Sequence, residues 1–193
     1  MNDLVPQSPQ SQARVRRVLN VGSGAPGGGR LHPGFEDGAW REVRLDIDPA
    51  VNPDIVASVI DLKSVVADES FDAIWSSHSL EHLHTHEVIP ALQEFRRVLR
   101  PGGRLMVLDF STPTSKPLKA LHDLFYFVVM PKVGRVVAWH RDAHHYTADS
   151  IRTWVSRDEL NEAILEAGFV DGHYVSLSTW FGTVHFGASA AAA

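Results

Sequence analysis

Two glycines and two carboxylates, each placed directly after a short apolar segment, are the residues of this chain whose spacing first suggests chemistry. The segment Val18–Val21 leads straight into the turn Gly22-Ser23-Gly24. Glycine permits positive φ, and the absence of a side chain lets a ligand lie against the backbone. An apolar strand followed by Gly-x-Gly begins many nucleotide-binding units, in which the ligand sits beyond the carboxyl end of the strand. We therefore expect Gly22 and Gly24 to lie against a ligand.

The second apolar segment, Val43–Leu45, ends in the carboxylates of Asp46 and Asp48. A carboxylate at this spacing from a glycine turn can accept hydrogen bonds from both hydroxyls of a ribose. The turn lacks the third glycine of dinucleotide sites, because Ala25-Pro26 interrupts it, and no Gly-Lys-Ser/Thr follows. The pattern therefore favours a nucleoside without phosphates, of which S-adenosylmethionine is the common one.

Histidines form a second group of residues that could carry chemistry. They cluster in two places, one after a predicted strand and one further along the chain: His78, His82, His84 and His86, then His140, His144 and His145. Neutral imidazoles at such spacing are common ligands of zinc or iron. The same residues are equally suited to a solvated loop or to a polar wall of a substrate pocket.

Composition limits the classes of function. The chain has 193 residues, enough for one domain with a sizeable core. A net charge of -5 argues against a nucleic-acid-binding surface, and the lack of cysteine excludes disulfides and thiolate sites. The longest strongly apolar run, Leu124–Met130, is far shorter than the roughly 20 residues that span a bilayer. No signal peptide opens the chain, so we expect a cytoplasmic protein.

Short apolar segments alternate with loops and helices along the chain. Residues 87–99 carry apolar side chains at a helical period, and residues 156–167 begin with a capping box of Ser156 and Glu159. The expected strands are 18–21, 43–48, 53–62, 71–75, 104–110, 173–177 and 183–186. This order predicts an α/β fold, a doubly wound and mostly parallel seven-stranded sheet with an antiparallel carboxyl-terminal strand.

The segments outside this pattern define the expected organisation of the chain. Residues 1–13 are predicted to be a disordered lead-in, 14–187 a single domain, and 188–193 a tail. The Gly- and Pro-rich residues 25–40 read as a loop where a long helix is usual. Residues 111–151 are long for a connection, and we expect them to form a helical insert over the ligand crevice.

Several motifs together resemble those of class I S-adenosylmethionine-dependent methyltransferases over residues 18–186. They are Val18-Leu-Asn-Val-Gly-Ser-Gly24, Leu45-Asp-Ile-Asp48, Phe71-Asp-Ala-Ile74, Leu80-Glu-His-Leu83 and Val98-Leu-Arg-Pro-Gly-Gly-Arg-Leu105. The carboxyl-terminal half is similar to the ubiquinone/menaquinone-biosynthesis C-methyltransferases. That similarity is carried by Asp109-Phe-Ser-Thr-Pro113, Asp123–Gly134, Arg141-Asp142, Tyr146, Asp149–Arg152, Ala167-Gly-Phe169 and Val184–Gly187.

This resemblance implies S-adenosylmethionine as cofactor and S-adenosylhomocysteine as product. It aligns Asp46 with the ribose-binding acid, which leaves Asp48 as a turn or helix-start residue. Ser58 and Val59 would flank the adenine, and Ser77 and His78 would lie near the sulfonium. The cofactor-binding residues expected are Asn20, Gly22, Ser23, Gly24, Asp46, Ile47, Ser58, Val59, Ser77 and His78. His82 belongs to a family motif that needs no metal, so we expect no metal site.

The acceptor implied is a small hydrophobic or aromatic molecule such as a quinol or phenol. Removal of its hydroxyl proton would increase electron density on the ring carbon that is methylated, and histidine is the natural general base. We expect His144 or His145 to be that base, with Tyr146 and Arg152 orienting the ring. Peripheral membrane contact suits a lipid quinol; the oligomeric state is left open.

Three departures from the family pattern keep other functions open. Asn20 replaces an acid before the glycine turn, Ser58 replaces an acid that meets the adenine amine, and the helix after the turn is eroded. These changes are compatible with weaker cofactor binding. The alternatives are methyl transfer to oxygen or nitrogen of another small molecule, and a methyltransferase-fold protein with a non-methylating reaction or a binding role.

Overall fold

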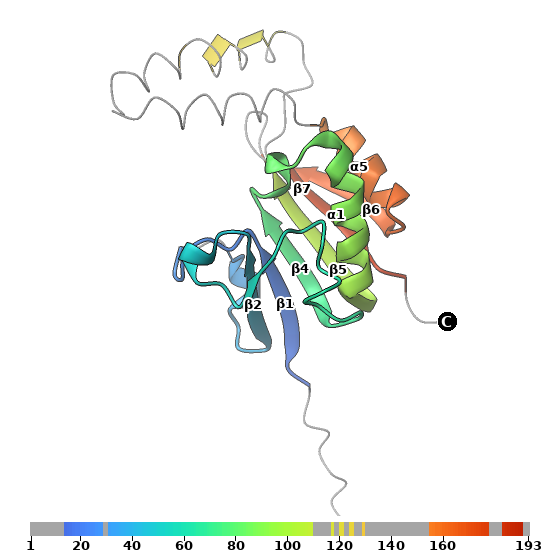
Figure 1. Ribbon diagram of the computed structural model, residues 1–193. Coiled ribbons are helices and arrows are strands. Elements are labelled where there is room, and N and C mark those ends of the chain that lie inside the picture. Colours follow the sequence, from blue (N-terminus) through green and yellow to red (C-terminus); the bar gives the residue numbers. More distant parts are fainter. Residues whose placement is uncertain are drawn as a thin grey trace, which may run out of the picture.

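A seven-stranded sheet in the order β3-β2-β1-β4-β5-β7-β6 forms the centre of the molecule (Figure 1). The computed structural model describes residues 14–28, 31–109, 155–177 and 183–190, with a few single positions between 117 and 129. Its strands are β1 (Arg16–Val21), β2 (Trp40–Asp46), β3 (Ile55–Val56), β4 (Phe71–Ser77), β5 (Leu99–Asp109), β6 (Val170–Ser176) and β7 (Thr183–Ala188).

The first five strands run parallel, and β7 is antiparallel to both β5 and β6. The strand order reverses at β1, which pairs with β2 on one side and β4 on the other. Ligands of open α/β sheets bind at such a reversal, beyond the carboxyl ends of the strands. The predicted fold class is confirmed, including the antiparallel strand near the carboxyl end.

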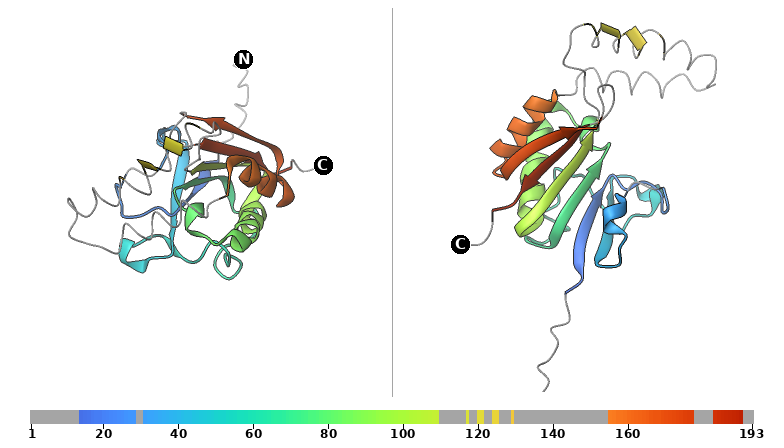
Figure 2. Two further views of the ribbon diagram at one scale, coloured as in Figure 1. Left: turned by 90° about the horizontal axis from the view of Figure 1, so that it is seen from above. Right: turned by 180° about the vertical axis from the view of Figure 1, so that it is seen from behind.

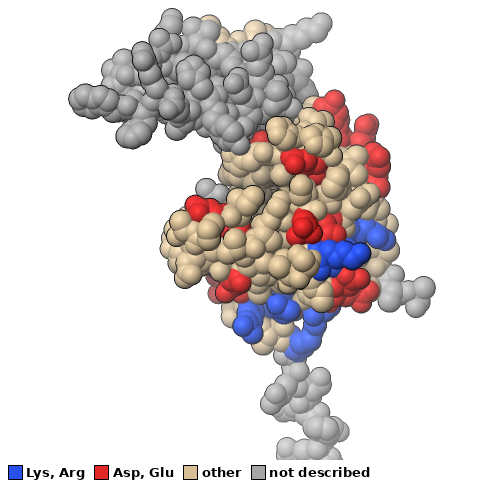
Figure 3. Space-filling model, viewed as in Figure 1, with Lys and Arg blue, Asp and Glu red and all other residues tan. Residues whose placement is uncertain are grey.

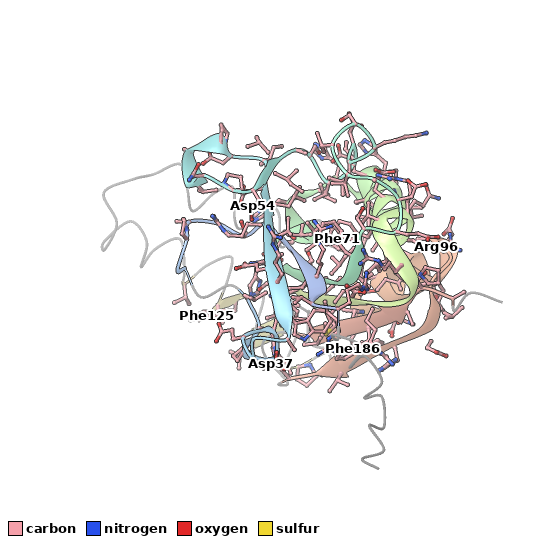
Figure 4. All side chains as sticks on the ribbon, turned by 90° about the horizontal axis from the view of Figure 1, so that it is seen from below. Asp37, Asp54, Phe71, Arg96, Phe125 and Phe186 are labelled. Atoms are coloured by element: carbon pink, nitrogen blue, oxygen red, sulfur yellow. The ribbon has the colours of Figure 1, made fainter. Side chains whose placement is uncertain are left out.

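One face of the sheet carries the main core. Helices α1 (Thr85–Val98) and α5 (Arg157–Glu166) pack on this face and touch each other (Figure 1). Both turn apolar side chains inward, Leu92 and Phe95 from α1 and Leu160 and Ile164 from α5. Phe71 of β4 is buried among them, near the middle of the sheet as seen from below (Figure 4).

An irregular segment, residues 57–70, completes this core without a regular helix of its own. Leu62 and Val66 anchor it in the core. Glu94 of α1 accepts a hydrogen bond from the backbone N–H of Leu62 at 3.0 Å, and Arg97 donates one to the carbonyl of Val66 at 3.0 Å. The two side chains also pair with each other at 2.8 Å, and Arg97 lowers the pKa of the Glu94 carboxyl. Hydrogen bonds from Glu94 and Arg97 of α1 therefore hold this segment against the core.

The opposite face of the sheet has a smaller cluster of apolar side chains. Its buried members are Val18, Phe35, Ala73 and Trp75, with Leu31, Trp40, Met106 and Leu108 packed against them. Among the described helices, only the short η1 (Pro33–Phe35) lies on this face, which is seen from behind in Figure 2. The helix usual after the glycine turn is thus absent from residues 25–28 and 31–39, as the sequence predicts.

Several predicted boundaries are wrong, among them the starts of β2 at Trp40 and β6 at Val170. The third strand is only Ile55–Val56, because Ala57, Ser58 and Val59 turn away to line a cleft. Helix α1 ends at Val98, and β5 begins at Leu99 with the Pro-Gly-Gly motif inside it. The ordered structure also extends beyond residue 187, where the tail was expected to begin. Strand β7 runs to Ala188, and the Ser189 N–H donates a hydrogen bond to the Gly103 carbonyl at 2.8 Å.

Candidate functional site

A cleft of about 470 Å³ opens at the carboxyl ends of β1, β2, β3 and β4. The wall of the cleft is formed by the last residues of these strands and the first residues of the loops that follow them. The lining residues are Val21, Gly22, Gly24, Leu45, Asp46, Ile47, Asp48, Val51, Ala57, Ser58, Val59, His78, Ser79, His82 and Leu83. This is the position at which an open parallel sheet binds its ligand.

The glycine turn forms the floor of this cleft. Gly22 and Gly24 both have positive φ, at 64° and 62°. A Cβ atom on Gly22 would lie 2.7 Å from the Cβ of Ser79, which belongs to the loop after β4. Gly22 is therefore required twice, once by its backbone conformation and once by the close approach of the neighbouring loop.

Two side chains from β2 hold the turn in place. Asp46 Oδ2 accepts a hydrogen bond from the Gly24 N–H at 2.9 Å, and Arg44 donates to the Gly24 carbonyl. Arg44 also donates to the carbonyls of Val51 and Asn52, at 3.0 Å and 2.9 Å, at the end of η2 (Pro49–Val51). These hydrogen bonds hold the peptide groups of the turn in place, where no long helix follows the turn to do so.

Asp46 retains room for a ligand despite these contacts. Its Oδ1 accepts the N–H of Asp48 at 3.0 Å, so each carboxylate oxygen takes one backbone donor. An ionised carboxylate offers about four lone-pair sites. Two sites remain for ribose hydroxyls, and Asp46 lines the cleft. Asp48 caps η2 by accepting from Ala50 at 2.8 Å, which confirms it as a helix-start residue.

The charges around the cleft suit a nucleoside better than a phosphate. Its described lining contains two aspartates and two histidines but neither lysine nor arginine. Arginines gather instead at the opposite end of the sheet, where Arg14 and Arg100 pair with Asp72 near the start of β1 (Figure 3). Carboxylates disfavour an anion and favour hydroxyl groups or a cation. The charges and hydrogen-bond acceptors of the cleft therefore fit a ribose and a sulfonium.

Seven of the ten residues predicted to bind cofactor line the cleft: Gly22, Gly24, Asp46, Ile47, Ser58, Val59 and His78. Ser23 and Ser77 are buried beside it and are not among the lining residues. Asn20 is 2% exposed and donates to Glu42 at 2.6 Å, away from the lining. The roles of all ten toward a cofactor stay predictions.

The other lining residues were not among those predicted to bind cofactor: Val21, Leu45, Asp48, Val51, Ala57, Ser79, His82 and Leu83. The last three come from the loop after β4, which includes η3 (Leu80–His82). His82 and Leu83 belong to the Leu80-Glu-His-Leu83 motif, which closely follows a strand that ends at this edge, so the sequence carries a signal for these two residues. The predicted catalytic residues His144, His145 and Tyr146 lie outside the described residues, as do Arg152 and most of the 111–151 insert.

A cluster of three titratable residues borders the cleft; we call His78, Glu81 and Asp109 the His78 cluster. Their nitrogen and oxygen atoms lie within 4.8 Å of one another, from the ends of β4 and β5 and from η3. His78 Nδ1 is 3.5 Å from Glu81 Oε1. Glu81 and Asp109 are 7% and 1% exposed.

A family model for the ubiE/COQ5 methyltransferase family matches residues 55–189. The chain belongs to this family. The matched region includes β3 to β7, the described helices α1 and α5, and the loop that carries His78. It leaves out the glycine turn and Asp46, whose assignment depends on the geometry described above.

Curated relatives are similar over the same part of the chain. The chain is 39% identical over 121 residues to the ubiquinone/menaquinone biosynthesis C-methyltransferase UbiE of Klebsiella pneumoniae, which covers 63% of this chain and 47% of the relative. The UbiE of Pasteurella multocida is 36% identical over 120 residues, 62% of this chain and 44% of the relative. The chain therefore spans about half the length of these relatives.

Solved structures share the fold at low sequence identity. The citrinin polyketide synthase CMeT domain superposes with a TM-score of 0.63 at 12% identity, over 94% of this chain and 48% of that one. A SAM-dependent methyltransferase from Archaeoglobus fulgidus gives 0.61 at 14% identity, over 90% and 86%. A Haemonchus contortus phosphoethanolamine N-methyltransferase 2, solved with S-adenosyl-L-methionine, gives 0.60 at 11%, over 92% and 49%. None of the helices in the described part of this chain is long and apolar enough to cross a membrane.

Proposed function

We propose that this chain binds S-adenosylmethionine in the cleft and transfers its methyl group to a small hydrophobic or aromatic acceptor. The single observation that carries the proposal is the convergence on one cleft of the glycine turn, Asp46 and the loop after β4. Family membership also supports it, since the family match covers residues 55–189, outside the glycine turn and Asp46.

The residues of the cleft divide by position among the parts of such a cofactor. Gly22 and Gly24 would let the methionine part lie against the backbone. Asp46 would accept the ribose hydroxyls, while Ser58 and Val59 would flank the adenine. His78 would lie toward the reactive end. When bound, the cofactor supplies an electrophilic methyl group; the chain's own contribution is to hold both reactants in line.

The acceptor that we propose is a hydroquinone with an unsubstituted ring carbon. The support is the name of the relatives as ubiquinone/menaquinone biosynthesis C-methyltransferases. The sequence of the 111–151 insert adds to it, because an apolar half from Leu118 to Val137 precedes a polar half from Trp139 to Tyr146. An apolar wall suits a hydrocarbon side chain, and the polar residues suit the ring hydroxyls. His144, His145 and Tyr146 remain the predicted polar contacts.

Methyl transfer can be tested directly with methyl-labelled S-adenosylmethionine and a short-chain 2-alkyl-1,4-naphthohydroquinone kept reduced by dithionite. We expect label on the ring carbon and an equimolar amount of S-adenosylhomocysteine. Label on a hydroxyl oxygen would show that the protein methylates oxygen and not the ring carbon. No transfer to this acceptor, while the cofactor still binds, would contradict the acceptor class and leave the cleft assignment standing.

A further inference from the structure

The His78 cluster combines a strained backbone with a buried pair of carboxylates. His78 is the first residue after β4 and has a φ of 51°, although it is not glycine. Its N–H donates to the carbonyl of Leu108 on β5 at 2.9 Å, which fixes the residue against the next strand. A non-glycine residue in the left-handed region has an unfavourable backbone conformation, and such residues are frequent at functional sites.

The imidazole of His78 is partly buried. Nδ1 is buried and faces Glu81 at 3.5 Å, whereas 37% of the side chain is exposed. His78 also lines the cleft. A carboxylate that faces Nδ1 favours the tautomer with its proton on Nδ1, which leaves the lone pair on Nε2. This is how a carboxylate prepares a histidine to act as a base.

Acidic side chains face the His78 ring from more than one element. Glu81 and Asp109 face it from η3 and β5, and Glu81 Oε2 is buried without a hydrogen-bond partner in the described structure. His82 lines the same side of the cleft, while Asp46 and Asp48 line it from β2. No lysine or arginine is among the described lining residues.

We propose that His78 is the general base of the reaction, with Glu81 and Asp109 as the residues that position it. The inference deepens the proposed function and rests on it. His78 Nε2 takes the proton of the acceptor's hydroxyl, and the released electron pair moves through the ring to the carbon that faces the methyl group. That carbon forms the new C–C bond while the S–CH₃ bond breaks, with sulfur keeping its electron pair.

The remaining steps restore the acceptor and the base. The methylated ring carbon loses its hydrogen as a proton to solvent, and the imidazolium returns its proton to the ring oxygen. One methyl cation equivalent enters and one proton leaves, so no oxidant or reductant is needed. The sequence prediction assigns the same proton to His144 or His145; the two assignments differ only in which residue accepts it.

The experiment compares four variants with the wild-type protein: His78→Gln, Glu81→Gln, the double variant of both, and His144→Gln/His145→Gln. His86→Gln is the matched control, because His86 is an exposed histidine on α1 outside the cleft lining. Calorimetry gives the affinity for S-adenosylhomocysteine, and steady-state transfer to the naphthohydroquinone gives kcat and KM from pH 5 to 9. Titration with Mn²⁺, followed by paramagnetic resonance, tests for metal binding.

We expect His78→Gln to lower kcat by about 10²–10⁴-fold, the usual contribution of general acid–base catalysis. It should also remove a limb of the pH–rate profile near neutrality and change product affinity less than about threefold. Glu81→Gln should lower kcat less than His78→Gln does. It should keep the limb of the pH–rate profile, because His78 is still present as the base. The double variant should be no slower than His78→Gln, since both act through one group. His86→Gln should match the wild-type protein.

Four results would overturn the proposal. Wild-type kcat and an intact limb in His78→Gln would exclude the residue as base, and loss of the limb in the His144/His145 variant alone would move the base to the insert. A large loss of product affinity in His78→Gln would make it a cofactor ligand instead. Stoichiometric Mn²⁺ that is lost in Glu81→Gln would make the cluster a metal site. Absence of transfer by the wild-type protein would refute the acceptor class, which is a separate and recognisable failure.

Discussion

His185 is a histidine whose environment keeps it neutral. It lies on β7 opposite Val107, is 2% exposed, and its ring is 5.4 Å from that of Tyr174. Burial lowers its pKa from 6.5 to about 4; Asp158 opposes this decrease, and Arg157 adds to it. Since desolvation penalises the charged imidazolium, the folded protein holds this side chain in its neutral form.

The pH dependence of stability follows from that pKa. The folded-state pKa is below the unfolded value, so the stability linked to His185 is complete above pH 6.5 and is lost as pH falls toward about 4. The loss at the acid end is about 3 kcal/mol, since one pKa unit corresponds to about 1.4 kcal/mol. His185→Phe should show a smaller decrease in unfolding free energy over this interval than the wild-type protein. His173→Gln, at a histidine on β6 outside the core, is the control and should decrease as the wild type does.

Single residues could be predicted from sequence where backbone chemistry specifies them. The glycine turn and Asp46 were found because only certain residue types fit a close approach or a ribose. The motif predicts that Asn20 binds the cofactor, yet alternation along β1 turns its side chain to Glu42 instead of the cleft. Glu81 was not predicted, because a glutamate in a polar motif gives no sign that it will be buried.

At the scale of elements, the glycine turn is held by its neighbours, since no long helix follows it in residues 25–28 and 31–39. Gly22→Ala should destabilise the protein for two reasons, the positive φ and the contact with Ser79 at 2.7 Å. Gly38 has a φ of 76°, and a Cβ added there would meet nothing within 4 Å, so Gly38→Ala measures the backbone cost alone, about 1–2 kcal/mol. Urea denaturation should show a greater loss for Gly22→Ala by at least about 1 kcal/mol, since overpacking costs about 1–3 kcal/mol. Equal losses would mean that the loop after β4 moves freely aside.

Elements with strong local signals were predicted with good boundaries. Ser156 and Glu159 form the capping box of α5, with Ser156 accepting from the Glu159 N–H at 3.3 Å and Glu159 from the Ser156 N–H at 2.7 Å. The limits of β3 and β5 were missed because they depend on partners. Leu99 pairs with Phe71 across the sheet, and this tertiary contact extends β5 back through a Pro-Gly-Gly motif that usually reads as a turn.

The whole molecule assembles its cleft from two parts of the sequence. Family similarity covers residues 55–189, whereas the glycine turn, Arg44 and Asp46 precede that region. The sheet brings both parts to one edge, because β1 pairs with β2 on one side and β4 on the other. Such an arrangement of a parallel sheet could be predicted from alternating strands and helices. The missing helix on the second face could also be predicted, from the Gly- and Pro-rich residues 25–40, but the packing of Leu31 and Phe35 on that face could not, because it depends on tertiary contacts with Trp75 and its neighbours.

Calorimetric titration with S-adenosylhomocysteine tests the central claim, that the cleft is the cofactor site. The wild-type protein should bind one equivalent. Asp46→Ala should weaken binding by at least about tenfold, because a charge-assisted hydrogen bond contributes roughly 1.5–3 kcal/mol. Asp61→Ala, which removes an exposed carboxylate outside the lining, should bind as the wild type does. No binding by the wild-type protein, or unchanged affinity in Asp46→Ala, would contradict the account.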